Sequence, residues 1–174
     1  MEKNNVKKKG FTLVELLVVV AIMLSLTGLS LAWYSNFSED KGLDKQVQDF
    51  IQTLEMAKNK AYAGDSSVCG NPGGITPHLE SYSVAVNSSK IEANPICIGT
   101  PTNYIYPIQT HIVFLTPTME VSFGLFGKPI SNQNVCIPLQ NITSNKCKYV
   151  NINESGLITS GACSSCSPIV CPCL

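Results

Sequence analysis

The chain has 174 residues, which leaves room for one compact domain of about 110 residues once a long N-terminal helix is set aside. Basic and acidic residues balance at twelve each, but four lysines fall within the first nine residues and the sequence contains no arginine. Beyond residue 10, 8 bases remain against 11 acids. A slightly acidic domain without arginine is a poor phosphate binder, so we do not expect nucleic acid as a partner.

An apolar run covers residues 11–33 and contains a single charged residue, Glu15. Its length meets the roughly 20 residues that a bilayer span needs, so it predicts a transmembrane helix. Three lysines precede the run and Trp33 closes it, which predicts a cytoplasmic N-terminus and an extracytoplasmic remainder. An ordinary secretory signal carries its small-residue cleavage site after the apolar core, whereas here Gly10 stands before it.

Beyond the predicted span, apolar residues recur at helical spacing. They follow one another at steps of three and four and comprise Leu43, Val47, Phe50, Ile51, Leu54, Ala57 and Ala61. Charged residues occupy the other positions, and no proline interrupts residues 11–63. We therefore predict one nearly continuous helix over residues 11–63.

From residue 64 the hydrophobic period changes from that of a helix to that of a strand, and Pro, Gly, Asn and Ser separate the short runs. This predicts an α+β protein whose head, residues 64–174, consists of antiparallel strands in two packed sheets. The expected strands are 66–69, 82–86, 104–106, 111–115, 121–123, 135–139, 149–153 and 157–159, with a hairpin turn at 153–156. The tail, residues 161–174, has no charge and too many turn-forming residues for a helix.

All eight cysteines follow the predicted span: Cys69, Cys97, Cys136, Cys147, Cys163, Cys166, Cys171 and Cys173. An even number in one small extracytoplasmic domain predicts disulfides, and the spacing leaves the pairing open. A thiolate zinc site at the last four cysteines is an alternative, but its central loop is short for structural zinc. A redox-active Cys-x-x-Cys pair would need a strand-to-helix setting that the tail lacks. We expect disulfides and no metal.

The sequence KKKGFTLVELL at residues 7–17 resembles the class III signal of type IV prepilins and type II secretion pseudopilins. The resemblance implies that residues 1–10 are a leader, which a prepilin peptidase in the membrane removes between Gly10 and Phe11 before it methylates Phe11. It also implies that the Glu15 carboxylate neutralises the terminal amine of a neighbouring subunit during assembly. The alternative interpretation of Glu15 is a polar residue tolerated near a helix end.

A second resemblance is to minor pilins and pseudopilins of the GspH/FimT type. It covers residues 43–69 and the late segment VNINESGLI at 150–158. Lys58 stands where an arginine is usual in that group, and the cysteine-rich tail lies outside its pattern.

The sequence carries no phosphate-binding loop, catalytic triad spacing or paired-carboxylate motif, and His78 and His111 are isolated, so we expect neither an enzyme nor a cofactor. The resemblance implies a structural subunit with one pass through the cytoplasmic (inner) membrane. This subunit would contact membrane lipid first, and then an assembly platform and sister pilins in a pilus or pseudopilus. The alternative is a minor pilin at the filament tip that binds a surface or DNA. The sequence leaves open the choice between pilus and secretion system, and that between major and minor subunit.

Overall fold

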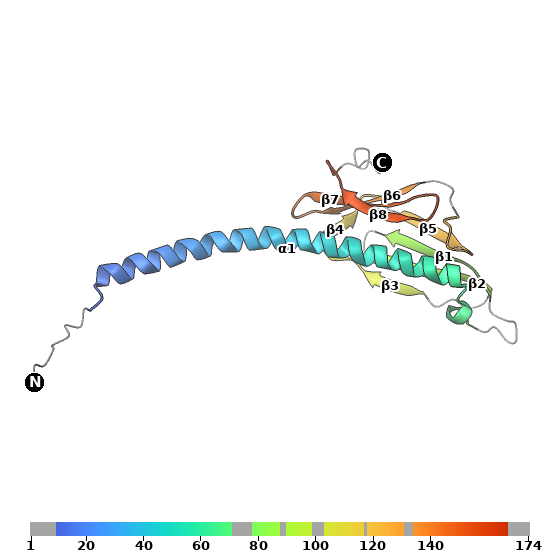
Figure 1. The fold of residues 1–174 in the computed structure, drawn as a ribbon, viewed down its shortest axis with the longest axis horizontal. Coiled ribbons are helices and arrows are strands. Elements are labelled where there is room, and N and C mark those ends of the chain that lie inside the picture. The colour runs from blue at the N-terminus through green and yellow to red at the C-terminus, as the bar shows by residue number, and fades with distance from the viewer. Residues whose placement is uncertain are drawn as a thin grey trace, which may run out of the picture. The chain divides into compact units, whose positions relative to one another are not determined.

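A computed structural model describes residues 10–70, 78–87, 90–98, 103–116, 118–130 and 134–166. Helix α1 covers Leu13–Ala63, close to the predicted range of 11–63 (Figure 1). The chain divides into two compact units, one ending at Ser38 and the other, the head, beginning at Glu39. The later part of α1 therefore belongs to the head.

Helix α1 ends in a turn that a glycine closes. Gly64 has a φ of +60°, a conformation that L side chains rarely adopt. Its N–H donates to the Ala61 carbonyl at 3.2 Å, and the Asp65 N–H donates to the Lys60 carbonyl at 3.1 Å. This pair of hydrogen bonds is a Schellman motif, so the helix stops where its last carbonyls find donors.

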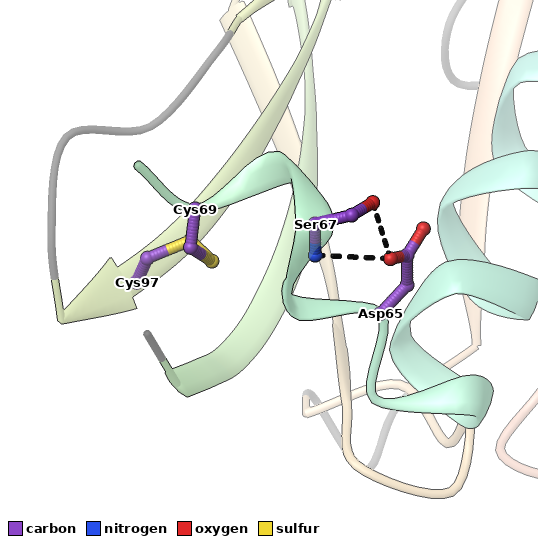
Figure 2. The surroundings of a disulfide bond; sticks show 4 residues. All are labelled: Asp65, Ser67, Cys69 and Cys97. Carbon is purple, nitrogen blue, oxygen red and sulfur yellow. Dashed lines mark hydrogen bonds between the residues drawn. A yellow bond between two sulfur atoms is a disulfide. The ribbon is translucent and has the colours of Figure 1, made fainter. Parts of the chain in front are cut away.

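Asp65 then caps a short 3-10 helix, η1 (Ser66–Val68). Its carboxylate accepts hydrogen bonds from the Ser67 N–H at 3.0 Å and from the Ser67 hydroxyl at 2.5 Å (Figure 2). These bonds, with a further one from Lys60, lower the pKa of Asp65. The strand predicted at 66–69 is therefore wrong. The Asp65 side chain accepts a hydrogen bond from the backbone here, and this bond favours a turn over pairing with a neighbouring strand.

The head contains two four-stranded antiparallel sheets, as predicted. One has the order β3-β2-β1-β5 and the other the order β4-β6-β7-β8. Their bounds are β1 (His78–Asn87), β2 (Lys90–Ile98), β3 (Tyr104–Pro107), β4 (Ile112–Phe114), β5 (Thr118–Gly124), β6 (Val135–Asn141), β7 (Lys146–Ile152) and β8 (Ile158–Ala162). In Figure 1 these strands gather around the later part of α1.

Strand β2 was not predicted, and Pro95 explains why. A proline cannot donate to a strand ladder, so its presence argues against a central strand. In the structure β3 pairs with β2 only from Lys90 to Ala93, so Pro95 lies beyond the end of β3. The missing N–H therefore costs the sheet no ladder hydrogen bond on that side.

One hydrophobic core joins α1 to both sheets. The α1 residues that it buries are Leu43, Val47, Phe50, Leu54, Ala57 and Ala61, each at most 2% exposed. Phe50 packs edge to face on Phe114 of β4, with ring centroids 5.3 Å apart. The predicted buried face of the helix is confirmed, except that Ile51 is only partly buried.

Candidate functional site

The predicted processing and assembly residues lie where α1 begins. Thr12 precedes the helix, and its hydroxyl accepts a hydrogen bond from the Glu15 N–H at 3.3 Å. The Leu16 N–H donates to the Thr12 carbonyl, also at 3.3 Å. Thr12 is thus the N-cap, and Glu15 lies in the first turn, where the helix dipole favours a carboxylate. The Thr-x-x-Glu spacing is a capping signal that the sequence analysis missed.

Gly10 and Phe11 lie before the helix, and both are exposed. The Phe11 side chain is 82% exposed. A Cβ added to Gly10 would meet no atom within 4 Å, and the backbone of Gly10 does not need a glycine for conformational reasons. The described fold of the chain therefore does not require a glycine at position 10.

The first unit exposes an apolar surface on every side of its helix. Five consecutive residues, 16–20, are all exposed, so no face of this part packs within the unit. The large apolar side chains exposed here are Phe11, Leu13, Val14, Leu16, Leu17, Val18, Val19, Val20, Ile22, Met23, Leu24 and Leu26. This surface requires an apolar environment from outside the chain.

Two hydroxyl groups on this surface are satisfied within the helix. Ser25 donates to the Ala21 carbonyl at 2.9 Å and Thr27 to the Met23 carbonyl at 2.5 Å. These bonds reduce the free-energy cost of burying either hydroxyl in an apolar medium.

Within the described residues, no helix reaches the length and hydropathy that crossing a membrane demands.

Lys58 links α1 to a turn of the second sheet. Its Nζ donates to the Gly156 carbonyl at 2.8 Å, and its ion pair with Glu55 spans 3.7 Å. Gly156 has a φ of +79° in the turn between β7 and β8, which is the predicted hairpin. The Asn153 carboxamide holds this turn by accepting hydrogen bonds from the N–H groups of Ser155 and Leu157.

A row of polar contacts fastens the start of the head's helix segment to β6 and β7. The amide of Asn141 is buried and donates to the Glu39 carbonyl at 3.1 Å. Lys146 pairs with Asp40, and Lys148 pairs with Asp44 at 2.5 Å. The hydrogen bond from Lys148 lowers the pKa of Asp44. None of these contacts was predicted, because their partners are about a hundred residues apart.

Disulfides, predicted without their pairing, are confirmed. Cys69 after η1 is bonded to Cys97 of β2, with Cα atoms 5.8 Å apart (Figure 2). Cys147 of β7 is bonded to Cys166, with Cα atoms 5.4 Å apart.

Cys136 and Cys163 are also disulfide-bonded, and no cysteine within the described residues is free. Cys171 and Cys173 lie outside the described residues. Cys166 is therefore committed to a partner on β7, which leaves the alternative zinc site without one of its four predicted ligands.

Both histidines of the head lie on its surface. His111 lies in an exposed turn before β4, not in the predicted strand, and His78 is exposed at the first residue of β1. Burial raises the pKa of Tyr82 to about 12, so its hydroxyl stays protonated. No group of three or more His, Cys, Asp or Glu residues in the described segments could hold a metal ion.

Known proteins are similar to this chain in two respects, the sequence of its N-terminal segment and its fold. The model of the prokaryotic N-terminal methylation motif matches residues 5–31. The fold is similar to that of the type IV minor pilin FimU of Pseudomonas aeruginosa strain PAO1, with a TM-score of 0.53 and 12% identity. The match covers 75% of this chain and 99% of the FimU chain. No curated protein matches the sequence.

The chain thus combines an N-terminal methylation motif with a pilin-like fold.

Proposed function

We propose that the chain is a structural subunit, a minor one, of a type IV pilus or a type II secretion pseudopilus. The observation that carries the proposal is the apolar surface on every side of residues 11–26, which nothing in its own unit covers. Burying an exposed leucine or valine side chain stabilises by about 1.5–3 kcal/mol. Membrane lipid would cover this surface before assembly, and the helices of sister subunits would cover it in the filament.

The proposed path begins with a single-pass protein of the inner membrane, with residues 11–33 as the span and the head on the extracytoplasmic side. Prepilin peptidase removes residues 1–10 and methylates Phe11. The subunit then passes from the assembly platform into the filament, whose core consists of packed copies of residues 11–63.

Glu15 supplies the proposed assembly contact. Its carboxylate, in the first turn of α1, pairs with the methylated amine of Phe11 on the adjacent subunit. Both charges are costly in an apolar filament core, and each reduces the cost of the other. In the free subunit, the positive end of the helix dipole lies beside this carboxylate, because Glu15 is in the first turn of α1.

Intact mass and N-terminal sequencing of the membrane form test the processing step. We expect a terminus at Phe11 that carries one methyl group. Gly10→Val should remain uncut although the chain itself tolerates it, because a Cβ at Gly10 meets no neighbouring atom. Gly28→Ala is the matched control, since a Cβ there also meets nothing and cleavage should proceed. An uncut Met1 terminus in cells with active peptidase would refute the proposal.

A second candidate is a binding module at the filament tip. Leu125, Phe126 and Ile130 expose apolar side chains around one turn after β5, and Phe126 has a φ of +74° there. Such a conformation is strained for a bulky residue, and strained residues cluster at binding sites. An apolar patch without arginine suits a protein or surface ligand better than DNA. Loss of adhesion in Phe126→Ser with filament number unchanged would favour this role.

A further inference from the structure

A groove in the head lies between α1 and β3. Two contacts hold these elements side by side (Figure 1). At one end, the Gln46 carboxamide oxygen accepts a hydrogen bond from the N–H of Gln109, just after β3, at 3.2 Å. At the other end, the Lys60 Nζ lies 5.7 Å from the centre of the Tyr104 ring. The groove holds about 540 Å³, within the roughly 300–1,000 Å³ typical of small-molecule sites, and every residue that lines it lies in the described part of the head.

The floor of the groove is apolar. It is formed by Met56 of α1, Ile91 of β2, and Tyr106 and Pro107 of β3. Tyr106 pairs with Ile91 in the sheet, so the two side chains lie on the same face. Ile91 is only 1% exposed, whereas Tyr106 is 37% exposed. The groove therefore offers one accessible aromatic ring beside a buried apolar side chain.

The walls of the groove are polar and carry no net charge. Lys45, Asp49 and Gln52 follow one another at steps of four and three along α1, so they lie on one side of the helix. The one positive charge, on Lys45, is balanced by the one negative charge, on Asp49. No ion pair in the described part of the chain involves either residue. Both charges are therefore available to a ligand.

Gln46 is a buried hydrogen-bond donor in this groove. It is 3% exposed, and among the described residues only its oxygen has a protein partner, the Gln109 N–H. Thr53 is similarly buried, but its hydroxyl donates to the Asp49 carbonyl at 2.9 Å. A buried donor without an acceptor costs free energy. A ligand that brings an acceptor oxygen to the Gln46 amide would remove this cost.

We propose that this groove binds the ring of an uncharged sugar. Sugar hydroxyls both donate and accept hydrogen bonds, as do the three glutamine amides of the walls. The apolar side of a sugar ring carries C–H groups, which suit the partly negative face of the Tyr106 ring. The balanced charges of Lys45 and Asp49 favour a neutral ligand over an anion or a cation.

An extended peptide fits this groove less well. It would bind by pairing with the outer edge of β3, a strand of four residues at the end of its sheet. The last of these residues is Pro107, which has no N–H to donate. The inference concerns the head alone and does not depend on the proposed role in a filament.

The first test is isothermal titration calorimetry of the full chain, purified in a detergent without a sugar headgroup. The probes are cellobiose, maltose, lactose and chitobiose, uncharged disaccharides that differ in linkage and in ring substituents. We expect at least one of them to bind with a dissociation constant of about 1 mM or lower, an ordinary value for a weak specific ligand. If none binds, the proposal is wrong.

Variants of the groove provide the second test. Tyr106→Ala should weaken binding by about fivefold, the middle of the range for one aromatic contact. Asp49→Ala should weaken it by about tenfold, because it removes a charged acceptor. Both positions are exposed, so both variants should keep the melting temperature of wild type. Tyr62→Ala is the matched control, because Tyr62 is 70% exposed on α1 and lies outside the groove. Equal affinities of Tyr106→Ala and Tyr62→Ala would refute the proposal.

A charged sugar tests the class of ligand. Glucuronate differs from glucose in having a carboxylate in place of the hydroxymethyl group. We expect it to bind no more tightly than glucose, because Lys45 attracts the carboxylate and Asp49 repels it. Tighter binding of glucuronate would identify a site for anions and overturn the proposal of a neutral sugar.

Discussion

The same helix contains similar residues in two different environments. Leu24 in the first unit is 69% exposed, whereas Leu54 in the head is fully buried. In the head, the helix segment packs against other parts of the same chain. It contributes to one hydrophobic core and makes polar contacts with β6 and β7, and disulfides hold the head together. In the first unit, backbone and hydroxyl groups form hydrogen bonds within the helix, and the large apolar side chains from Phe11 to Leu26 are exposed. The head therefore buries its apolar side chains in its own core, whereas the apolar side chains of residues 11–26 need lipid or another protein chain to cover them.

The largest effect should come from Glu15→Ala, which tests the dependence of the first unit on outside partners. The change leaves a neighbour's amine without its carboxylate in an apolar core, at a cost of several kcal/mol. We expect at least a tenfold loss of the subunit from sheared filaments, with its level in the membrane unchanged. Quantitative immunoblotting of both fractions measures this.

Thr12→Ala is the control, because it removes the helix cap and keeps the carboxylate. Capping contributes about 0.5–2 kcal/mol to a helix, so incorporation should persist. Intact mass must show that both variants are processed. If Glu15→Ala incorporates normally, or if the two variants fail equally, the assembly role assigned to the carboxylate is wrong.

In the head, removing the Cys69–Cys97 bond should have the largest effect on stability. The two residues are 28 positions apart in sequence. A loop of that size limits the unfolded chain by about 3–4 kcal/mol. We expect the double variant Cys69→Ser/Cys97→Ser to lower the melting temperature in circular dichroism by about 10 °C or more. Reduced wild type serves as reference, and an unchanged melting temperature would contradict the prediction.

Lys58→Met should have a smaller effect, because it keeps the length of the side chain and removes its hydrogen bond to the Gly156 carbonyl. Hydrogen bonds to charged groups contribute about 1.5–3 kcal/mol, and the lysine side chain is 27% exposed, so we expect about 1–2 kcal/mol. Urea unfolding of the head, followed by a spectroscopic signal from its strands, measures the loss in free energy of unfolding. Lys58→Arg keeps a charged donor and should retain most of the stability. Equal losses in both variants would show that packing, not the hydrogen bond, matters.

The smallest predicted effect is a pH dependence at Asp44. The Lys148 hydrogen bond lowers the pKa of this carboxyl in the folded state, so the folded chain binds fewer protons than the unfolded chain. The stabilisation is present above the ordinary carboxyl pKa of about 4 and is lost as pH falls through the lowered value. The stabilities of wild type and Asp44→Asn should therefore converge as pH falls below the ordinary carboxyl pKa of about 4. In a Lys148→Met background, Asp44→Asn should change the slope less, because only Lys41 then still lowers the pKa of Asp44.

Local patterns were enough to predict part of this molecule. The period of the apolar residues gave the buried helix face, from Leu43 to Ala61, because helical geometry repeats along the chain whatever it packs against. The hairpin turn at Asn153 and Gly156 was predictable for a similar reason, since its hydrogen bonds lie within five residues. The motif around Gly10, Phe11 and Glu15 is likewise readable from neighbouring residues alone, and the family model matches it.

The sequence by itself determined the helix, the α+β class, the two-sheet head and the presence of disulfides. Only the tertiary structure decided that β2 can contain Pro95 and that residues 66–68 form a 3-10 helix capped by Asp65. It also decided which cysteines pair. These outcomes depend on where β3 ends, on one side-chain cap and on the register of β6, β7 and β8. Contacts of this kind join residues far apart in sequence, so no periodicity or short motif records them.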